Sequence, residues 1–242
     1  MRLLVIIVTY NAMQWLERAL GSVSDYNVTV IDNGSSDGTP EWIRTHFPAV
    51  RLIESGENLG FGKANNLGFR QALEQGYDYV YLLNQDAWPL PGAIERMLEV
   101  AEANPGFGIL SPLQMADGCT RMDRNFGKIC GPYLEKSDEE LVDVDFVMAA
   151  HWLIPVRALK IFGGFSPVFP LYGEDNDLVN RARYHGFRVG VVRSVLAVHD
   201  REDRPYSQRS HMSLKYMNAM ALMLHPGRCF ALQAIIRPLS MI

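Results

Sequence analysis

The sequence predicts an α/β domain built on a mostly parallel sheet that is flanked by helices. Between residue 3 and about 112, apolar runs rich in β-branched residues alternate with segments in which apolar residues recur every three or four positions. Helix caps and turn residues separate the two kinds of segment. Strand, helix and strand in succession is typical of a parallel sheet with helices on both faces.

The predicted elements of this region follow the pattern in order. Strands are expected at 3–8, 28–32, 50–53, 79–84 and 108–112. Helices are expected at 12–23, 40–47, 63–76 and 92–105. Thr39 followed by Pro40 is a typical helix start and Gly76 a typical helix end, so the local signals agree with the periodicity.

The pattern changes after residue 112. Residues 113–145 have weak periodicity and an acidic run, which predicts a long irregular loop over the sheet. Beyond it we expect a strand at 147–155, a short helix at 156–164, a helix at 178–186 and a strand ending at His199. The whole predicts one domain with two halves, 1–112 and 113–203, followed by a helical C-terminal extension at 204–242.

Composition limits the classes of function. A content of 48% hydrophobic and 21% charged residues predicts a folded chain. The net charge of -4 argues against a nucleic acid as the main partner. Cys119, Cys130 and Cys229 are odd in number and scattered, which favours a reducing cytosol over a disulfide framework. The apolar run at residues 3–8 is too short to span a membrane and is expected to be a buried strand.

The predicted C-terminal extension is basic and apolar. No acidic residue follows Asp203, whereas the basic residues include Arg204, Arg209, Lys215, Arg228 and Arg237. A helix packed on the body of the protein or on a second subunit explains this composition, and so does peripheral contact with a membrane.

Polar residues follow several predicted strands at the point where each strand ends. In an open parallel sheet, ligands bind outside these carboxyl ends. Each residue alone can be explained as part of a turn or a helix cap, but together they point to one crevice. They are Thr9, Tyr10 and Asn11 after the first strand, Asp32, Asn33 and Gly34 after the second, Asn84, Gln85 and Asp86 after the fourth, and His199 and Asp200 at the end of the last.

The stretch YGEDNDL at 172–178 places three carboxylates within four positions. Acidic residues in a first helical turn are favoured by the helix dipole, and Asp177 can pair with Arg181. This structural reading accounts for Glu174 and Asp177 better than for Asp175. The alternative is a catalytic carboxylate.

Five motifs, taken in order, resemble the inverting family-2 nucleotide-sugar glycosyltransferases of the GT-A fold, particularly their short bacterial rhamnosyltransferase-like members. The resemblance runs from residue 3 to about 200. The motifs are VIIVTYN, VIDNGSSDGT, ENLGFGKANNLG, YLLNQDAWPLPGAIERM, and the stretch from GGFSPVFPLYGEDNDL to AVHD.

The resemblance implies roles for residues of the first half. Asp32 would accept a hydrogen bond from the imide of uracil or thymine, and 1–112 would be the nucleotide-sugar-binding half. The implied nucleotide-binding residues are Thr9, Tyr10, Asn11, Asp32, Lys63, Asn65 and Asn84. Asp86 matches the last carboxylate of the family's DxD motif, whose first position is Asn84 here, and His199 would be a second ligand to Mn²⁺ or Mg²⁺.

The resemblance also implies the chemistry of the second half, 113–203, which would bind the acceptor. Asp175 would be the general base, with Glu174 in support. Trp152, Gly164 and Asp177 would shape the surfaces that meet the donor and acceptor sugars.

The implied function is transfer of a sugar from a UDP- or dTDP-sugar, with dTDP-rhamnose as one candidate, to a saccharide acceptor in cell-surface polysaccharide biosynthesis. The implied acceptors include lipid-linked saccharides, and the expected place is the cytoplasm, with the inner face of the membrane as one location within it. Two alternatives belong to other classes. A sugar-1-phosphate nucleotidyltransferase would need a GxGxR-type loop after the first strand, where this chain has TYNAMQWLER. A sugar-nucleotide-binding module without activity would not need the base and metal residues.

Overall fold

The computed structural model describes residues 1–201 and 208–227. Its strands are β1 Leu3–Thr9, β2 Asn27–Asp32, β3 Arg51–Glu54, β4 Tyr79–Asn84, β5 Ala87–Pro89, β6 Phe107–Met115, β7 Leu141–Asp143, β8 His151–Pro155 and β9 Arg188–His199. Its helices are α1 Leu16–Gly21, α2 Thr39–His46, α3 Phe61–Glu74, α4 Ala93–Ala103, α5 Arg124–Leu134, α6 Val156–Phe162, α7 Glu174–Tyr184 and α8 Gln208–Met223.

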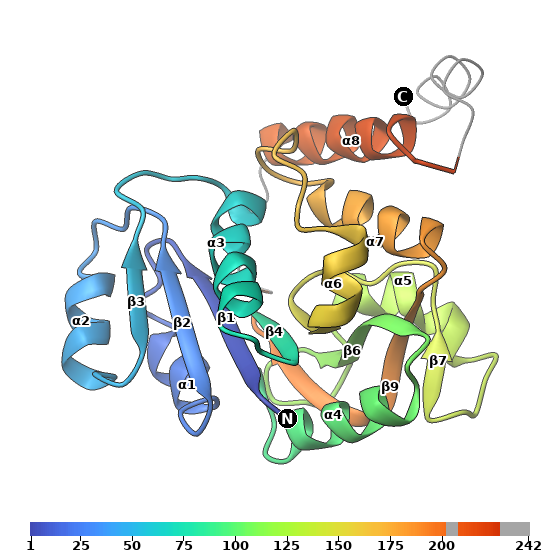
Figure 1. Ribbon diagram of the computed structural model, residues 1–242, viewed down its shortest axis with the longest axis horizontal. Helices are drawn as coiled ribbons and strands as arrows, with labels where there is room; N and C mark the ends of the chain where they lie inside the picture. Colours follow the sequence, from blue (N-terminus) through green and yellow to red (C-terminus); the bar gives the residue numbers. More distant parts are fainter. Residues whose placement is uncertain (202–207, 228–242) are drawn as a thin grey trace.

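The strands of the described residues form one sheet in the order β3-β2-β1-β4-β8-β6-β9-β5, and β7 also pairs with β9 (Figure 1). The four strands β3, β2, β1 and β4 are parallel. β8 runs antiparallel to both β4 and β6, while β6 and β9 are parallel to each other. The predicted α/β class is confirmed, and the sheet is mixed: its parallel part is the first four strands together with the β6–β9 pair.

Two hydrophobic cores lie on opposite faces of the sheet, because successive side chains of a strand point to opposite faces. Leu4 and Ile6 of β1 belong to one core, which α3, α5, α6 and α7 cover. Leu3, Val5 and Ile7 belong to the other, which α1, α2 and α4 cover. The predicted flanking of the sheet by helices on both faces is therefore confirmed.

The segment that we expected to be irregular, 113–145, contains α5 and β7. Asp123 caps α5, since its carboxylate accepts hydrogen bonds from the backbone N–H groups of Asn125 and Phe126 at 3.0 and 2.8 Å. Phe126 and Cys130, four residues apart, are fully buried. The helix escaped prediction because it contains poor helix formers, namely Gly127, Gly131 and Pro132.

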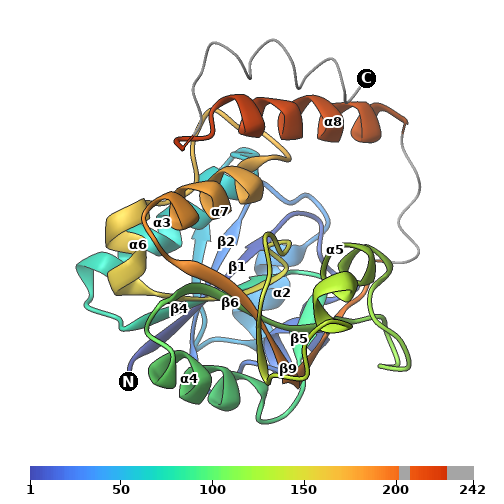
Figure 2. The ribbon, with the colours of Figure 1, turned by 90° about the vertical axis from the view of Figure 1, so that its right-hand side faces the viewer.

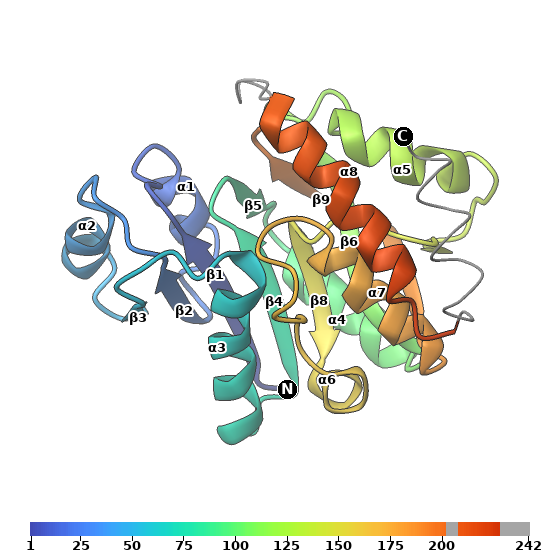
Figure 3. The ribbon, with the colours of Figure 1, turned by 90° about the horizontal axis from the view of Figure 1, so that it is seen from above.

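The helical extension expected at 204–242 is represented by α8, which lies against α7 in all three views (Figures 1, 2 and 3). Asn180 of α7 donates a hydrogen bond to the Ala221 carbonyl of α8 at 3.4 Å. The remaining predicted residues, 204–207 and 228–242, lie outside the described residues. Within the part of the chain that the structure describes, no helix is long and apolar enough to cross a membrane.

Gly68 lets α3 pack directly on β1. A Cβ atom at this position would lie 2.7 Å from Cδ1 of Ile6, which is fully buried and has no room to move. We expect Gly68→Ala to lower the free energy of unfolding by about 1–3 kcal/mol, the usual cost of overpacking a core. Urea denaturation measures this change in the free energy of unfolding, and the m value should stay the same as in the native protein.

The matched control is Gly127→Ala in α5, where an added Cβ would make an ordinary 3.7 Å contact with Met122. Replacing a helical glycine by alanine without a clash is stabilising by about 0.5–1 kcal/mol. Equal effects of the two substitutions would contradict the close packing of α3 on β1.

Candidate active site

The carboxyl ends of β1, β2 and β4 lie side by side. Thr9 of β1 is in register with Asp32 of β2, and Val8 with Asn84 of β4. The polar residues that end these strands therefore gather at one edge of the sheet, as we expected. Figure 3 views the molecule from above Figure 1 and shows α8 crossing it beside α7.

Asp32 organises the turn after β2. It is only 2% exposed. Its Oδ1 accepts hydrogen bonds from the hydroxyls of Thr9 and Ser35, and its Oδ2 accepts from the backbone N–H groups of Gly34 and Ser35. A carboxylate has about four lone-pair sites. A ligand that hydrogen-bonds to Asp32 would thus have to displace one of these donors, of which the hydroxyls can rotate.

The loop after β1 is fastened to its two neighbours. Gln85 accepts from the Tyr10 N–H at 2.7 Å and donates to the Tyr10 carbonyl at 3.3 Å. Asn11, which has a positive φ of 51°, accepts from the Ser36 N–H at 2.9 Å. The Tyr10 side chain is 48% exposed and borders this edge. Gln85 follows β4 directly, but its part in fixing the loop was not predicted.

Asp86 and His199 are brought together at the ends of two antiparallel strands. The Asp200 N–H donates to the Asp86 carbonyl at 2.8 Å, and Ala87 is in register with His199. Both side chains are buried, and His199 Nε2 lies 3.7 Å from Asp86 Oδ1.

This pair fits part of a metal site. A carboxylate oxygen and an imidazole nitrogen suit Mn²⁺, and at this separation both can reach one ion with bonds of about 2.1 Å. The described residues contain no group of three or more His, Cys, Asp or Glu side chains that could hold a metal. An ion here would need ligands beyond these two side chains.

The segment Met148–Ala150 joins this edge to α7. The Ala150 carbonyl accepts from the Asn84 N–H at 3.0 Å. The backbone N–H of the next residue back, Ala149, is close enough to the Asp175 carboxylate to lower its pKa. Asp175 therefore lies beside this segment, whose Ala150 carbonyl meets the end of β4.

Helix α7 begins at Glu174, after Gly173 in the left-handed conformation with a φ of 82°. Asp175 is partly exposed, and its Oδ1 accepts from the backbone N–H and the side-chain amide of Asn176 at 2.8 and 3.3 Å. Burial raises the pKa of Asp175, and the hydrogen bonds from Asn176 and the nearby Ala149 backbone lower it. Burial has the larger effect, so the net pKa is about 6. A carboxylate with such a pKa is ionised at neutral pH and more basic than an ordinary one.

Glu174 differs from its neighbour. It is 6% exposed, and its Oε2 accepts no hydrogen bond from the described residues. Burial, and after it the charge of Asp175, raise the pKa of Glu174 to about 7. Both adjacent carboxyl groups are thus more basic than ordinary ones.

Asp177 forms the predicted pair with Arg181, whose Nε lies 2.9 Å from Asp177 Oδ2. The same guanidinium donates to the carbonyls of Phe162 and Gly164. Asp177 and Gly164 are therefore linked through Arg181, and the pair fastens the Gly163–Phe165 loop to α7. Because both side chains are largely buried, this pair is more constrained than a surface ion pair.

The residues predicted on α3 are placed differently from one another. Lys63 is exposed in the first turn. Asn65 is 1% exposed and donates to the Phe61 carbonyl of its own helix at 2.9 Å, so we leave it out of the proposed nucleotide contacts. Its neighbour Asn66, which we did not predict, exchanges two hydrogen bonds of 2.8 Å with the backbone of Phe165.

The structure corrects the prediction for Trp152. We expected it to shape a sugar-binding surface, but it is fully buried in β8 and stacks against Phe165 at a centroid distance of 6.1 Å. It points into the core beneath the helices because it alternates along β8 with Leu153, which faces the other core.

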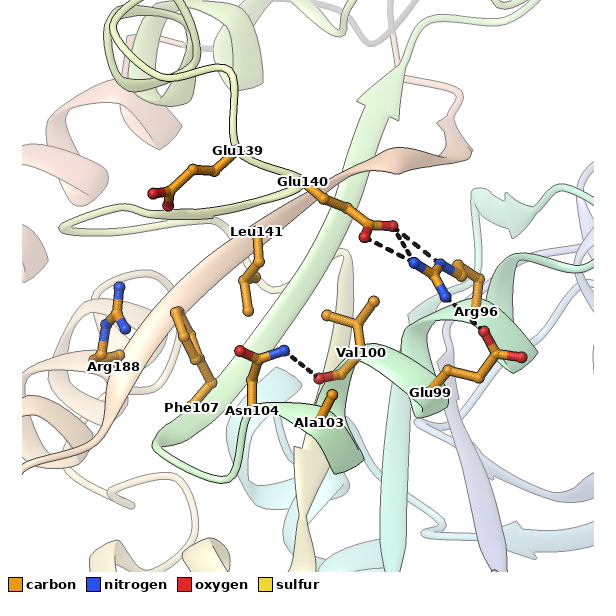
Figure 4. A pocket seen from close by; sticks show the side chains of 10 residues that line it. All are labelled: Arg96, Glu99, Val100, Ala103, Asn104, Phe107, Glu139, Glu140, Leu141 and Arg188. Atoms are coloured by element: carbon orange, nitrogen blue, oxygen red, sulfur yellow. Dashed lines mark hydrogen bonds and ion pairs between the residues drawn. The ribbon is translucent and has the colours of Figure 1, made fainter.

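A cavity of about 320 Å³ lies away from this edge, beside α4 and the amino ends of β6 and β9 (Figure 4). Most of its charged groups are already paired: Arg96 binds Glu140 and Glu99, and Arg188 binds Asp143. The cavity therefore does not compete with the carboxyl edge as a candidate site.

A family model described as glycosyl transferase family 2 matches residues 4–160. This chain belongs to glycosyl transferase family 2. The matched part includes the strand ends that hold Thr9, Asp32 and Asp86, and it ends before α7.

Two curated relatives are similar to this family-2 chain in sequence. The N-acetylglucosaminyl-diphospho-decaprenol L-rhamnosyltransferase of Mycobacterium tuberculosis is 29% identical over 229 residues, which cover 81% of this chain and 75% of that protein. The undecaprenyl-phosphate mannosyltransferase of Micrococcus luteus is 37% identical over 106 residues, which cover 41% of this chain and 44% of that protein. The resemblance to rhamnosyltransferase-like members is confirmed.

Solved structures of low sequence identity share the fold. S. aureus TarS superposes with a TM-score of 0.69 at 15% identity, covering 96% of this chain, which spans 41% of the TarS chain. The mannosyltransferase PcManGT from Pyrobaculum calidifontis, solved with GDP-Man and Mn²⁺, gives a TM-score of 0.68 at 22% identity and covers 93% of this chain and 62% of that one. The predicted GT-A-like fold is confirmed.

The raised pKa of Glu174 makes a prediction about stability. Its pKa is about 7 in the folded protein against 4.5 ordinarily, so its contribution to stability is complete below pH 4.5 and is lost as the pH rises through 7. We expect Glu174→Gln to match the native melting temperature near pH 4.5 and to exceed it by about 2–6 °C at pH 8. Thermal unfolding across this pH range measures the difference.

The control is Glu17→Gln, which replaces an exposed glutamate in α1. The melting temperature of this variant should not rise above that of the native protein between pH 4.5 and pH 8. A Glu174→Gln variant that is equally destabilised at both pH values would contradict the raised pKa.

Proposed function

We propose that this chain is an inverting glycosyltransferase that moves a sugar from a dTDP- or UDP-sugar, with dTDP-rhamnose as the first candidate, to a lipid-linked saccharide acceptor in cell-surface polysaccharide biosynthesis. The family supports the reaction class. The name of the mycobacterial relative supports the donor sugar and the lipid-linked acceptor. An enzyme that uses such an acceptor would work at a membrane, and we propose its inner face. The observation on which the proposal depends is the environment of Asp175.

Asp175 is suited to act as the general base. It is ionised at neutral pH, partly exposed at the carboxyl edge, and held by donors from Asn176 and Ala149. A base works best when its pKa is near the operating pH and its position is fixed. In the proposed reaction the acceptor hydroxyl gives its proton to Asp175, and its oxygen forms a bond to the anomeric carbon.

The bond between the anomeric carbon and the nucleoside diphosphate breaks on the opposite face, so the configuration inverts and the diphosphate leaves with the electron pair. A divalent ion held by Asp86 and His199 would offset the charge on that diphosphate. The nucleotide contacts proposed for the first half, 1–112, are Thr9, Tyr10, Asn11, Asp32, Lys63 and Asn84. The acceptor would bind the second half, 113–203, beside Gly164.

Replacing Asp175 by asparagine tests the base directly. The amide keeps the size of the side chain but cannot accept the proton, so we expect transfer to fall about 10²–10⁴-fold. Affinity for the nucleotide and the melting temperature should stay near native. Transfer is measured by release of the nucleoside diphosphate in the presence of donor and acceptor.

Glu174→Gln and Asp177→Asn are the controls in the same helical turn. We expect smaller losses, and Asp177→Asn should act through Arg181 and lower stability. Native transfer by Asp175→Asn together with an inactive Glu174→Gln would move the base to Glu174. A chain that binds sugar nucleotides but never consumes them would instead be a binding module, and one that makes pyrophosphate would be a nucleotidyltransferase.

The metal pair makes a separate prediction. Chelation should abolish transfer, and Asp86→Ala should weaken nucleotide binding in Mn²⁺ without recovery on adding more Mn²⁺. Titration calorimetry with UDP, dTDP and GDP, with and without Mn²⁺, measures the binding. Asp200→Asn, which removes the adjacent carboxylate, is the control and should keep native affinity for the nucleotide.

Full activity in excess EDTA would contradict the metal assignment. Binding of GDP as tight as that of UDP or dTDP would contradict the nucleobase assignment.

A further inference from the structure

Helix α8 contacts the turn of α7 that contains Asp175. A Cβ atom on Gly173 would lie 2.7 Å from the Met217 carbonyl oxygen, so the two backbones approach closely here. Asn176 donates a side-chain hydrogen bond to Asn218 Oδ1 at 3.2 Å. These contacts come from the chain beyond residue 203, which the family model does not include.

The side-chain amide of Asn176 has two donors, and the structure gives each a partner. Nδ2 lies 3.3 Å from Asp175 Oδ1 and 3.2 Å from Asn218 Oδ1. The terminal torsion of an asparagine is otherwise broad. An acceptor on Asn218 therefore selects the rotation of Asn176 that points its second N–H at the carboxylate.

We propose that Asn218 is a positioning residue for the reaction: through Asn176 it fixes the carboxylate of Asp175. The inference depends on the proposed function, in which Asp175 is the base. A catalytic carboxylate stays in its productive orientation more of the time when its hydrogen-bond donor is itself fixed by a neighbour. Its reaction is then faster than that of a freely rotating carboxylate. Helix α8 would thus take part in catalysis without touching the substrate.

A purely structural role for α8 can be separated from this one, because a second asparagine makes a similar contact. Asn180, one turn after Asn176, donates to the Ala221 carbonyl at 3.4 Å. It joins the same two helices, and within the part of the chain that the structure describes it makes no hydrogen bond to Asp175. Asn180→Ala removes one hydrogen bond between the helices and leaves the Asn218–Asn176–Asp175 series unchanged.

The test compares Asn218→Ala, Asn218→Asp and Asn180→Ala in the full-length chain. We expect Asn218→Ala to lower kcat about tenfold, the factor that corresponds to one hydrogen bond, with KM for the donor unchanged. Asn218→Asp keeps the acceptor oxygen and should stay within about threefold of native kcat at pH 8. Asn180→Ala should keep native kcat.

The pH profile of kcat adds a readout that packing alone would not change. Loss of the fixed Asn176 donor raises the pKa of Asp175, so the acid limb should move to higher pH in Asn218→Ala and stay in place in Asn180→Ala. Neither variant changes a charged group, so the charges on the elements around this turn are the same in both. They include Glu174 and the Asp177–Arg181 pair on α7, Lys63 on α3, Lys215 on α8, and the Asp123–Arg201 pair beside Met148.

Equal losses of kcat in Asn218→Ala and Asn180→Ala, without a shift of the acid limb, would overturn the inference and leave α8 a packing element. Asp175→Asn is measured beside them. If it transfers sugar at the native rate, the proposed function fails and this inference fails with it. If it is inactive while Asn218→Ala behaves as native, only the positioning role is wrong.

Discussion

The direction of β8 determines the geometry of the candidate site. This strand runs antiparallel to β4, with His151 in register with Leu83, so the residues that precede it lie at the carboxyl ends of the parallel strands. Met148–Ala150 thereby meets both Asn84 and Asp175. A parallel strand in the same place would bring these residues to the opposite edge. The reversal joins the carboxyl ends of the parallel strands to the helix with the carboxylates.

A buried network holds β8 in this position. His151 is fully buried between the Tyr81 hydroxyl and the Val198 carbonyl, each at 2.9 Å. Burial lowers the pKa of His151 to about 4, so the ring is neutral and can donate from one nitrogen while it accepts at the other. Val198 directly precedes His199 in β9. The hydrogen bond between His151 and Val198 therefore connects the start of β8 to the end of β9, where His199 lies.

Much of the fold could be predicted from the sequence, because strand positions follow from apolar runs and their ends from polar residues. The gathering of Thr9, Asp32 and Asn84 follows from parallel pairing alone. The direction of β8 could not be predicted, since an apolar run looks the same in either direction. Trp152 was misjudged for a related reason: a residue type shows that a side chain can bind a ligand, whereas burial depends on which face the neighbouring elements cover.

The contact between Gly173 and Met217 has a consequence for the order in which the protein is completed. Chains fold from the N-terminal side during synthesis, and both cores of the sheet consist of residues that precede α8. The strands and their two cores can therefore pack before the helix that approaches the turn of Asp175 has left the ribosome. A nascent chain would acquire its fold before it acquires the contacts of α8 with this turn, so the stability of the sheet and the final order around Asp175 would arise at different lengths of the same polypeptide.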